Sequence, residues 1–250
     1  MARTLKQTRL RTPIIIALFC FTTTLWAQSE NDVEYQMELG GGLGTSFYMG
    51  DANGTPFAHM SGMGSIIARK IFNPRMTLKG NLALGHISGN SQGNFIPIDA
   101  SSETPEGGIP TTVSFSRNVI DFGAQFEMNF WGYTINSGYS ENSRFTPYAL
   151  AGLGFTVAPG GAGTQFALNL PVGVGVKFKL RPRVNIGMEW TMRFTTSDAL
   201  DASSKETSQL IHPYGIKSIG LKNKDCYSFT MVFLTYDLCP KCKECHNNDD

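Results

Sequence analysis

The clearest pattern in the chain is a strict alternation of apolar and polar residues over long segments. Between Val184 and Phe194 every second residue is apolar, and the residues between them are Asn185, Gly187, Glu189, Thr191 and Arg193. The same period of two recurs in four further segments, 33–39, 76–85, 120–130 and 166–180. Because successive side chains of a strand point to opposite faces, this pattern predicts strands with one apolar and one polar face.

Weaker alternation brings the number of expected strands to an even total of eight, typical of single-chain bacterial barrels. The additional segments are 58–72, 145–158 and 227–238. Most of the alternating runs reach ten residues or more, the length that a tilted strand needs to cross a bilayer. A soluble β-sandwich is the alternative, but its strands usually span only about 5–6 residues. We therefore predict an all-β fold, an eight-stranded antiparallel transmembrane β-barrel of small OmpA-like size.

The expected connections differ in length between the two ends of the barrel. One end has the short turns 73–75 and 181–183 together with the longer segment 131–144. The connections expected at the other end are 49–57, 88–113, 159–165 and 195–226. Outer-membrane barrels have short periplasmic turns and longer extracellular loops, so the pattern predicts periplasmic N- and C-termini. The segment 131–144 is long for a periplasmic turn.

The N-terminus has the features of a secretory signal. Positive residues precede an apolar run at 13–21, and a polar stretch at 22–24 follows it. This arrangement predicts a signal peptide over 1–27 with cleavage near Ala27. Phe19 is bulky where a lipoprotein signal needs a small residue, which disfavours a lipid anchor on Cys20. We expect the barrel over 28–238 and a short Cys-rich periplasmic tail over 239–250.

Charge bears on both the partners and the interior. Charged residues make up 16% of the chain and the formal net charge is +1, which argues against nucleic-acid binding. The polar faces carry both signs in similar number, at Glu34, Glu38, Lys79, Arg117, Asp121, Glu127, Lys177, Lys179, Glu189 and Arg193. An eight-stranded barrel is only wide enough for its side chains, and charges inside it must pair or be hydrated. We predict an ion-paired, plugged lumen and no diffusion pore.

Two motifs could carry chemistry. The glycine run 40–44 is not followed by a helix that could bind phosphate, so glycines in a curved barrel strand explain it better. The pair His86 and Ser88 resembles the His-x-Ser pair of outer-membrane lipid A deacylases. A nucleophilic serine also needs an orienting acid, and the sequence marks none. We expect no catalytic residues, no cofactor and no small-molecule substrate, and keep a lipid-modifying enzyme as the alternative.

Four cysteines follow the signal. Cys226 is expected at the opposite end of the last strand from Cys239, about 40 Å away at the rise of a strand, which is beyond the reach of a disulfide. For the tail, three interpretations remain open: a local disulfide, a zinc site and a c-type haem attachment sequence. The residues concerned are Cys239, Cys242, Cys245 and His246.

Several longer motifs resemble one family. They are the segments 38–51, 73–75, 145–148, 189–194, 198–201 and 225–237. Together they resemble the PorG-type barrel of the type IX secretion system of Bacteroidetes. The resemblance implies a non-enzymatic outer-membrane component of a protein-export machine, which also supports gliding motility in some species. It further implies partners in a periplasmic ring, a lipoprotein and its partner protein of the PorK and PorN types.

The expected periplasmic face offers a docking surface for such a ring. Aromatic and arginine residues are common interface anchors, and this face combines them with the cysteine tail. The candidates are Trp131, Tyr133, Tyr139, Arg144, Cys239, Cys242 and Cys245. The alternative for Trp131 and Tyr133 is membership of the aromatic girdle at the membrane interface.

Overall fold

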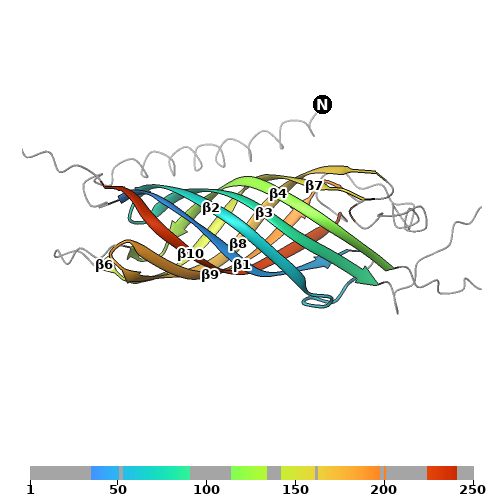
Figure 1. The fold of residues 1–250 in the computed structure, drawn as a ribbon, viewed down its shortest axis with the longest axis horizontal. Coiled ribbons are helices and arrows are strands. Elements are labelled where there is room, and N and C mark those ends of the chain that lie inside the picture. The colour runs from blue at the N-terminus through green and yellow to red at the C-terminus, as the bar shows by residue number, and fades with distance from the viewer. Residues whose placement is uncertain are drawn as a thin grey trace, which may run out of the picture. The chain divides into compact units, whose positions relative to one another are not determined.

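Eight long strands form a closed antiparallel barrel in the computed structural model (Figure 1). The structure describes residues 35–50, 53–90, 114–133, 142–160, 163–197, 200 and 224–240. The barrel strands are β1 Tyr35–Met49, β2 Ser61–Asn73, β3 Met76–Asn90, β4 Ser114–Asn129, β7 Phe145–Ala158, β8 Gln165–Arg181, β9 Val184–Thr195 and β10 Cys226–Pro240. The predicted number of strands is confirmed.

The strand order is a simple meander that closes on itself. Each barrel strand pairs with its neighbours along the chain, and β1 pairs with β10 to complete the barrel. This last pairing runs from Tyr35 opposite Pro240 to Met49 opposite Cys226. No strand edge is therefore left open within the barrel, as a membrane-spanning sheet requires.

The alternation places apolar side chains outside and ionic ones inside. In β9, Glu189 and Arg193 are buried, whereas Met188 and Trp190 are exposed. The same phase holds in β3, β4 and β8, where Leu82, Phe122 and Val174 are among the exposed residues. An apolar belt of this kind is stable only against acyl chains, because a soluble protein would bury it. The fold is thus the predicted transmembrane barrel.

The two ends of the barrel are named here by their connections. The turn end carries the tight β2–β3 and β8–β9 turns, and the loop end is the opposite one. Two strands extend further toward the loop end than the alternating segments predicted. β3 continues to Asn90, and β4 already begins at Ser114. β10 runs to Pro240, so Cys239 belongs to this strand and the tail begins later than the predicted residue 239.

The long connection at the turn end contains structure that the sequence did not predict. β5 Gly132–Tyr133 and β6 Asn142–Ser143 pair in parallel. The backbone N–H of Tyr133 donates to the carbonyl of Pro74 at 3.1 Å. This part of the connection is thereby attached to the β2–β3 turn.

Some predictions fall on residues outside the described parts of the chain. They concern the signal peptide 1–27, Glu34, Tyr139, and the tail residues Cys242, Cys245 and His246. Among the described residues, no helix has the length and apolar character needed to cross a membrane.

Candidate functional site

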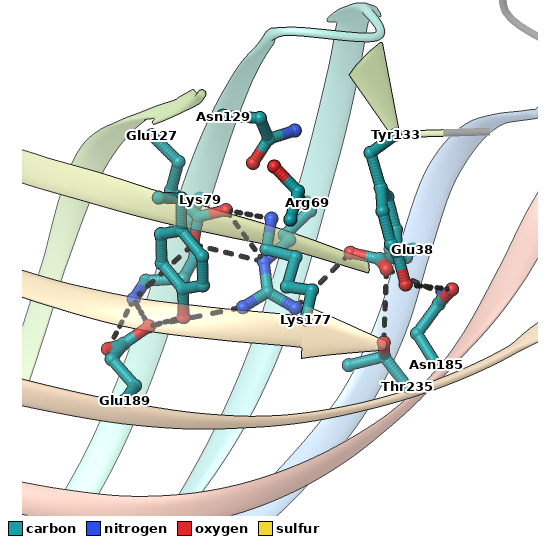
Figure 2. Close-up of polar contacts among 12 residues, drawn as sticks. Glu38, Arg69, Lys79, Glu127, Asn129, Tyr133, Lys177, Asn185, Glu189 and Thr235 are labelled. Atoms are coloured by element: carbon teal, nitrogen blue, oxygen red, sulfur yellow. Dashed lines mark hydrogen bonds and ion pairs between the residues drawn. The ribbon is translucent and has the colours of Figure 1, made fainter. Parts of the chain in front are cut away.

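The turn-end half of the barrel holds a network of buried ion pairs around Glu127 (Figure 2). Arg69 Nε lies 3.1 Å from Glu127 Oε1, and Lys79 Nζ lies 3.6 Å from the same oxygen. Lys177 Nζ approaches the other oxygen at 2.5 Å. Each of the four side chains comes from a different strand, β2, β3, β4 or β8, so the network joins half of the barrel wall across the lumen.

Two further carboxylates extend the network. Glu189 accepts from Lys79 Nζ at 2.7 Å and from the hydroxyl of Tyr148 at 2.6 Å. Glu38 lies 3.2 Å from Arg69 Nη1. The three cations of the network therefore face three carboxylates, and the charges balance within the lumen.

Arg69 was not among the predicted lumen residues, although it lies at the centre of the network. Ile67, two residues before Arg69 on the same inward face, is apolar and fully buried. The alternation of apolar and polar residues in segment 58–72 is therefore weak, and it did not reveal the inward face. The guanidinium of Arg69 also stacks on the ring of Phe233, 4.5 Å from the centroid. The register supplies the missing signal, since Arg69 lies opposite Glu38 on β1 and opposite Lys79 on β3.

A second group of contacts closes the turn end of the lumen. Lys179 Nζ pairs with Asp237 Oδ2 at 2.5 Å. Asn185 donates to Glu38 and to Asp237 at 2.6 Å each, and its Oδ1 accepts from the hydroxyl of Tyr133 at 2.8 Å. Burial, with the nearby Glu38 and Asp237 carboxylates, raises the pKa of Tyr133, so its hydroxyl stays a donor.

Tyr133 therefore belongs to the lumen, although the sequence suggested docking or the girdle. Its ring lies under Lys179 Nζ, 5.3 Å from the centroid. The side chain enters the barrel from the β4–β7 connection and covers the ionic network (Figure 2). The sequence gave no sign of this, because the residue lies outside the alternating segments.

A third group lies nearer the loop end, around Asp121. Arg193 Nε lies 3.1 Å from Asp121 Oδ1. Asn169 and the hydroxyl of Tyr227 both donate to Asp121 Oδ2, at 2.6 and 2.7 Å. The Arg193 guanidinium is 4.2 Å from the ring centroid of Phe229. Asp121 and Arg193 thus form a buried ion pair inside the barrel.

Arg117 closes the lumen further toward the loop end. Its guanidinium donates to the carbonyl oxygens of Pro159, Gly163 and Leu200 at 3.2, 2.6 and 3.2 Å. Leu200 is held in turn by Asp225, whose Oδ2 accepts from its backbone N–H at 2.8 Å. Arg117 therefore ties the β7–β8 and β9–β10 connections to the barrel.

The described interior is a packed, charge-balanced plug. Arg69, Lys79, Glu127 and Glu189 are each at most 1% exposed. Buried charges of this kind cost several kcal/mol each to desolvate and are tolerated when paired. Among the described residues, no three or more His, Cys, Asp or Glu side chains are placed to hold a metal ion. The arrangement can brace the barrel wall.

His86 has polar partners other than Ser88. Its Nδ1 lies 2.8 Å from Asn118 Oδ1, and its Nε2 lies 2.9 Å from Ser116 Oγ. Both partners are on β4, and Ser88 lies opposite Ser116 in the register. The sequence motif thus located the histidine, but the serine within hydrogen-bond distance of its ring comes from the neighbouring strand.

The remaining docking candidates lie at the turn end. Trp131 is 49% exposed and packs against exposed Phe145 at 5.7 Å between centroids, an arrangement that also suits an aromatic girdle. Arg144 and Cys239 are exposed. Cys226 lies at the loop end of β10, where its thiol donates to the carbonyl of Met49 at 3.2 Å. The two described cysteines lie at opposite ends of one strand, so they cannot pair with each other, as predicted.

Comparison with solved structures finds similar proteins at low sequence identity. Ail, the attachment invasion locus protein of Yersinia pestis, has a TM-score of 0.44 and 14% identity in its complex with the heparin analogue sucrose octasulfate, covering 82% of this chain and 100% of that chain. Neisserial surface protein A has a TM-score of 0.47 and 11% identity, over 81% of this chain and 97% of its own. The N-terminal β-barrel domain of Pseudomonas aeruginosa OprF has a TM-score of 0.42 and 8% identity, over 82% of this chain and 98% of its own.

No curated protein matches the sequence. A family model does, and it covers residues 13–247, which include every strand of the barrel. The chain therefore belongs to the family described as Domain of unknown function (DUF6089).

Proposed function

We propose that this barrel is an outer-membrane component of the type IX protein secretion machinery that anchors a periplasmic ring complex. The observation that carries the proposal is the filled lumen. Ion pairs centred on Glu127 and on Asp121 cross the interior at two levels, so a secreted protein has no passage through these residues. A barrel of this kind suits an anchor, and another, larger barrel would supply the translocation pore.

The turn end is the periplasmic side in this proposal. Short turns face the periplasm in outer-membrane barrels, and the described chain both starts and ends there, at Tyr35 and Pro240. The partners are then a ring lipoprotein and its partner protein, of the PorK and PorN types that the sequence resemblance implies. The lipid bilayer contacts the apolar belt.

The docking surface in this proposal consists of Trp131, Arg144 and the tail that follows Pro240, with Cys242 and Cys245. Trp131 and Arg144 are exposed beside the turn end, where a partner can reach them. Tyr133 is left out because its side chain is held inside the lumen by Asn185. Its role is to keep the connection fixed under the docking surface.

The test is a deletion that spares the barrel. Removing 241–250 leaves β10 complete to Pro240, so the variant should remain a heat-modifiable barrel in the membrane. It should no longer co-purify with the ring proteins, and secretion should fall. A matched variant, Cys226→Ser, changes a cysteine at the loop end and should retain both. Normal co-purification of the deleted protein would refute the tail contact, and normal secretion in a strain that lacks the whole protein would refute the secretion role.

A further inference from the structure

A serine, a histidine and an asparagine form a connected chain on the outer face of the barrel near its loop end. Ser116 Oγ lies 2.9 Å from His86 Nε2, and His86 Nδ1 lies 2.8 Å from Asn118 Oδ1. The amide oxygen of Asn118 can only accept, so it selects the tautomer of His86 that carries its proton on Nδ1. Nε2 is then the free base, and it faces the Ser116 hydroxyl.

The barrel holds these groups in a defined geometry. His86 lies opposite Asn118 in the β3–β4 register, and Ser116 is two residues from Asn118 on the same face of β4. The backbone of His86 is fixed from the inside, because the buried Ser46 hydroxyl donates to its carbonyl at 2.6 Å. Ser116 and Asn118 are exposed and His86 is half-buried, so the cluster is accessible from outside the barrel.

Counting residues along the strand gives the approximate height of the cluster in the membrane. His86 follows the exposed apolar residues Leu82 and Leu84 on the outer face of β3, and on the neighbouring β4 Ile120 lies opposite Leu84, on the turn-end side of the cluster. About ten residues of a tilted strand separate Met76 at the turn end from His86, which corresponds to roughly 25 Å of height. This equals the height of the apolar band, so the cluster is placed at the boundary between acyl chains and headgroups.

We propose that Ser116 and His86, with Asn118 as the positioning residue, form a serine acyl-hydrolase site that cleaves carboxylic esters of lipid acyl chains in the leaflet at the loop end. A nucleophile next to a base, with the base oriented by a third group, is the arrangement that such chemistry requires. This activity goes beyond the proposed anchoring role and uses none of the residues of the lumen network.

The reaction balances with water as the co-reactant. Ser116 Oγ attacks the ester carbonyl while its proton passes to His86 Nε2. The carbon–oxygen bond to the lipid alcohol then breaks, and the alcohol leaves with that proton. Water then attacks the acyl-serine while His86 takes its proton. The bond between the acyl group and Ser116 breaks, the fatty acid is released, and His86 gives the proton back to the Ser116 oxygen. Asn118 keeps the imidazole oriented throughout.

The test uses the mature chain folded in detergent and treated with a fluorophosphonate probe, followed by peptide mass spectrometry. The expected result is a phosphonylated Ser116. Labelling should be lost in Ser116→Ala and reduced at least about 100-fold in His86→Ala, the scale on which a general base contributes. Ser88→Ala is the matched control, a serine on the same face opposite Ser116, and it should label normally. Heat-modifiable migration checks that each variant is folded.

Two vesicle compositions identify the ester. Fatty-acid release is measured from vesicles of phospholipid alone and from vesicles that also contain lipopolysaccharide. Release from the first assigns glycerophospholipid esters, and release only from the second assigns lipopolysaccharide acyl esters. Both support the site.

The role of Asn118 has its own readout. Asn118→Ala should lower the rate and change its pH profile, because the imidazole loses the acceptor that sets its tautomer. Asn118→Asp restores an acceptor and should recover the rate. Labelling at Ser88, or no labelling and no fatty-acid release from correctly folded protein, would overturn the proposal and leave the cluster as a polar rim.

Discussion

Glu127 balances more cations than any other carboxylate in the described ion pairs, and this makes it the most informative residue of the lumen. Arg69, Lys79 and Lys177 all lie within 4.0 Å of its two oxygens. Replacing Glu127 with Gln keeps its size but leaves three buried cations with less negative charge. Removing one partner of a buried pair costs about 3–5 kcal/mol, and we expect a loss of this order in the free energy of unfolding. Urea unfolding in detergent micelles measures it, with exposed Arg181→Gln as the control.

Gly44 offers a second residue-scale test, because β1 and β10 approach each other closely there. A Cβ at this position would lie 1.9 Å from the Thr230 carbonyl oxygen, whereas a Cβ at Gly62 meets nothing within 4 Å. Gly44→Ala should therefore lower the free energy of unfolding by about 1–3 kcal/mol, the usual cost of overpacking. Gly62→Ala should leave it within about 0.5 kcal/mol, the range of unremarkable surface changes. Equal stability of the two variants would contradict the close approach.

At the scale of the element, alternation predicted the barrel strands because the period of two is a direct consequence of strand geometry. It located the inward faces of β3, β4, β8 and β9 residue by residue. Alternation could not find Tyr133, since a short connection that folds back into the lumen has no period. It could not pair His86 with Ser116 either, because that contact depends on the register between β3 and β4.

The cost of placing arginine on the outward face of a strand should depend on the depth of the position in the membrane. Val174 lies near the middle of β8 and is 52% exposed, and Leu180 lies at its turn end and is 49% exposed. Arginine on the lipid face costs about 2–4 kcal/mol at the membrane midplane and about 0–1 near an interface. Val174→Arg should therefore lower the free energy of unfolding in lipid vesicles much more than Leu180→Arg. Equal costs would place Val174 outside the hydrocarbon region.

For the whole molecule, the decisive property is that three groups of contacts fill the lumen in succession. Tyr133 and Asn185 close the turn end, the Glu127 network comes next, and Asp121 with Arg193 lies further toward the loop end. The Glu127 and Asp121 groups also contain contacts across the barrel, from Lys79 on β3 to Glu189 on β9 and from Tyr227 on β10 to Asp121 on β4, so the interior also braces its shape. We expect that the loss of one group leaves the lumen filled by the other two.

This redundancy leads to a test of permeability. Vesicles containing the folded protein should not swell in an isotonic monosaccharide solution, in contrast to vesicles containing a porin. Tyr133→Ala removes the cover at the turn end, yet these vesicles should also stay impermeable, because the paired charges around Glu127 still occupy the cross-section. Swelling with the unaltered protein would mean that sugars pass the paired charges, and the anchoring role would lose its main support. Swelling only with Tyr133→Ala would instead mean that the Tyr133 side chain alone blocks the lumen, and that the ion-pair network leaves room for a sugar to pass.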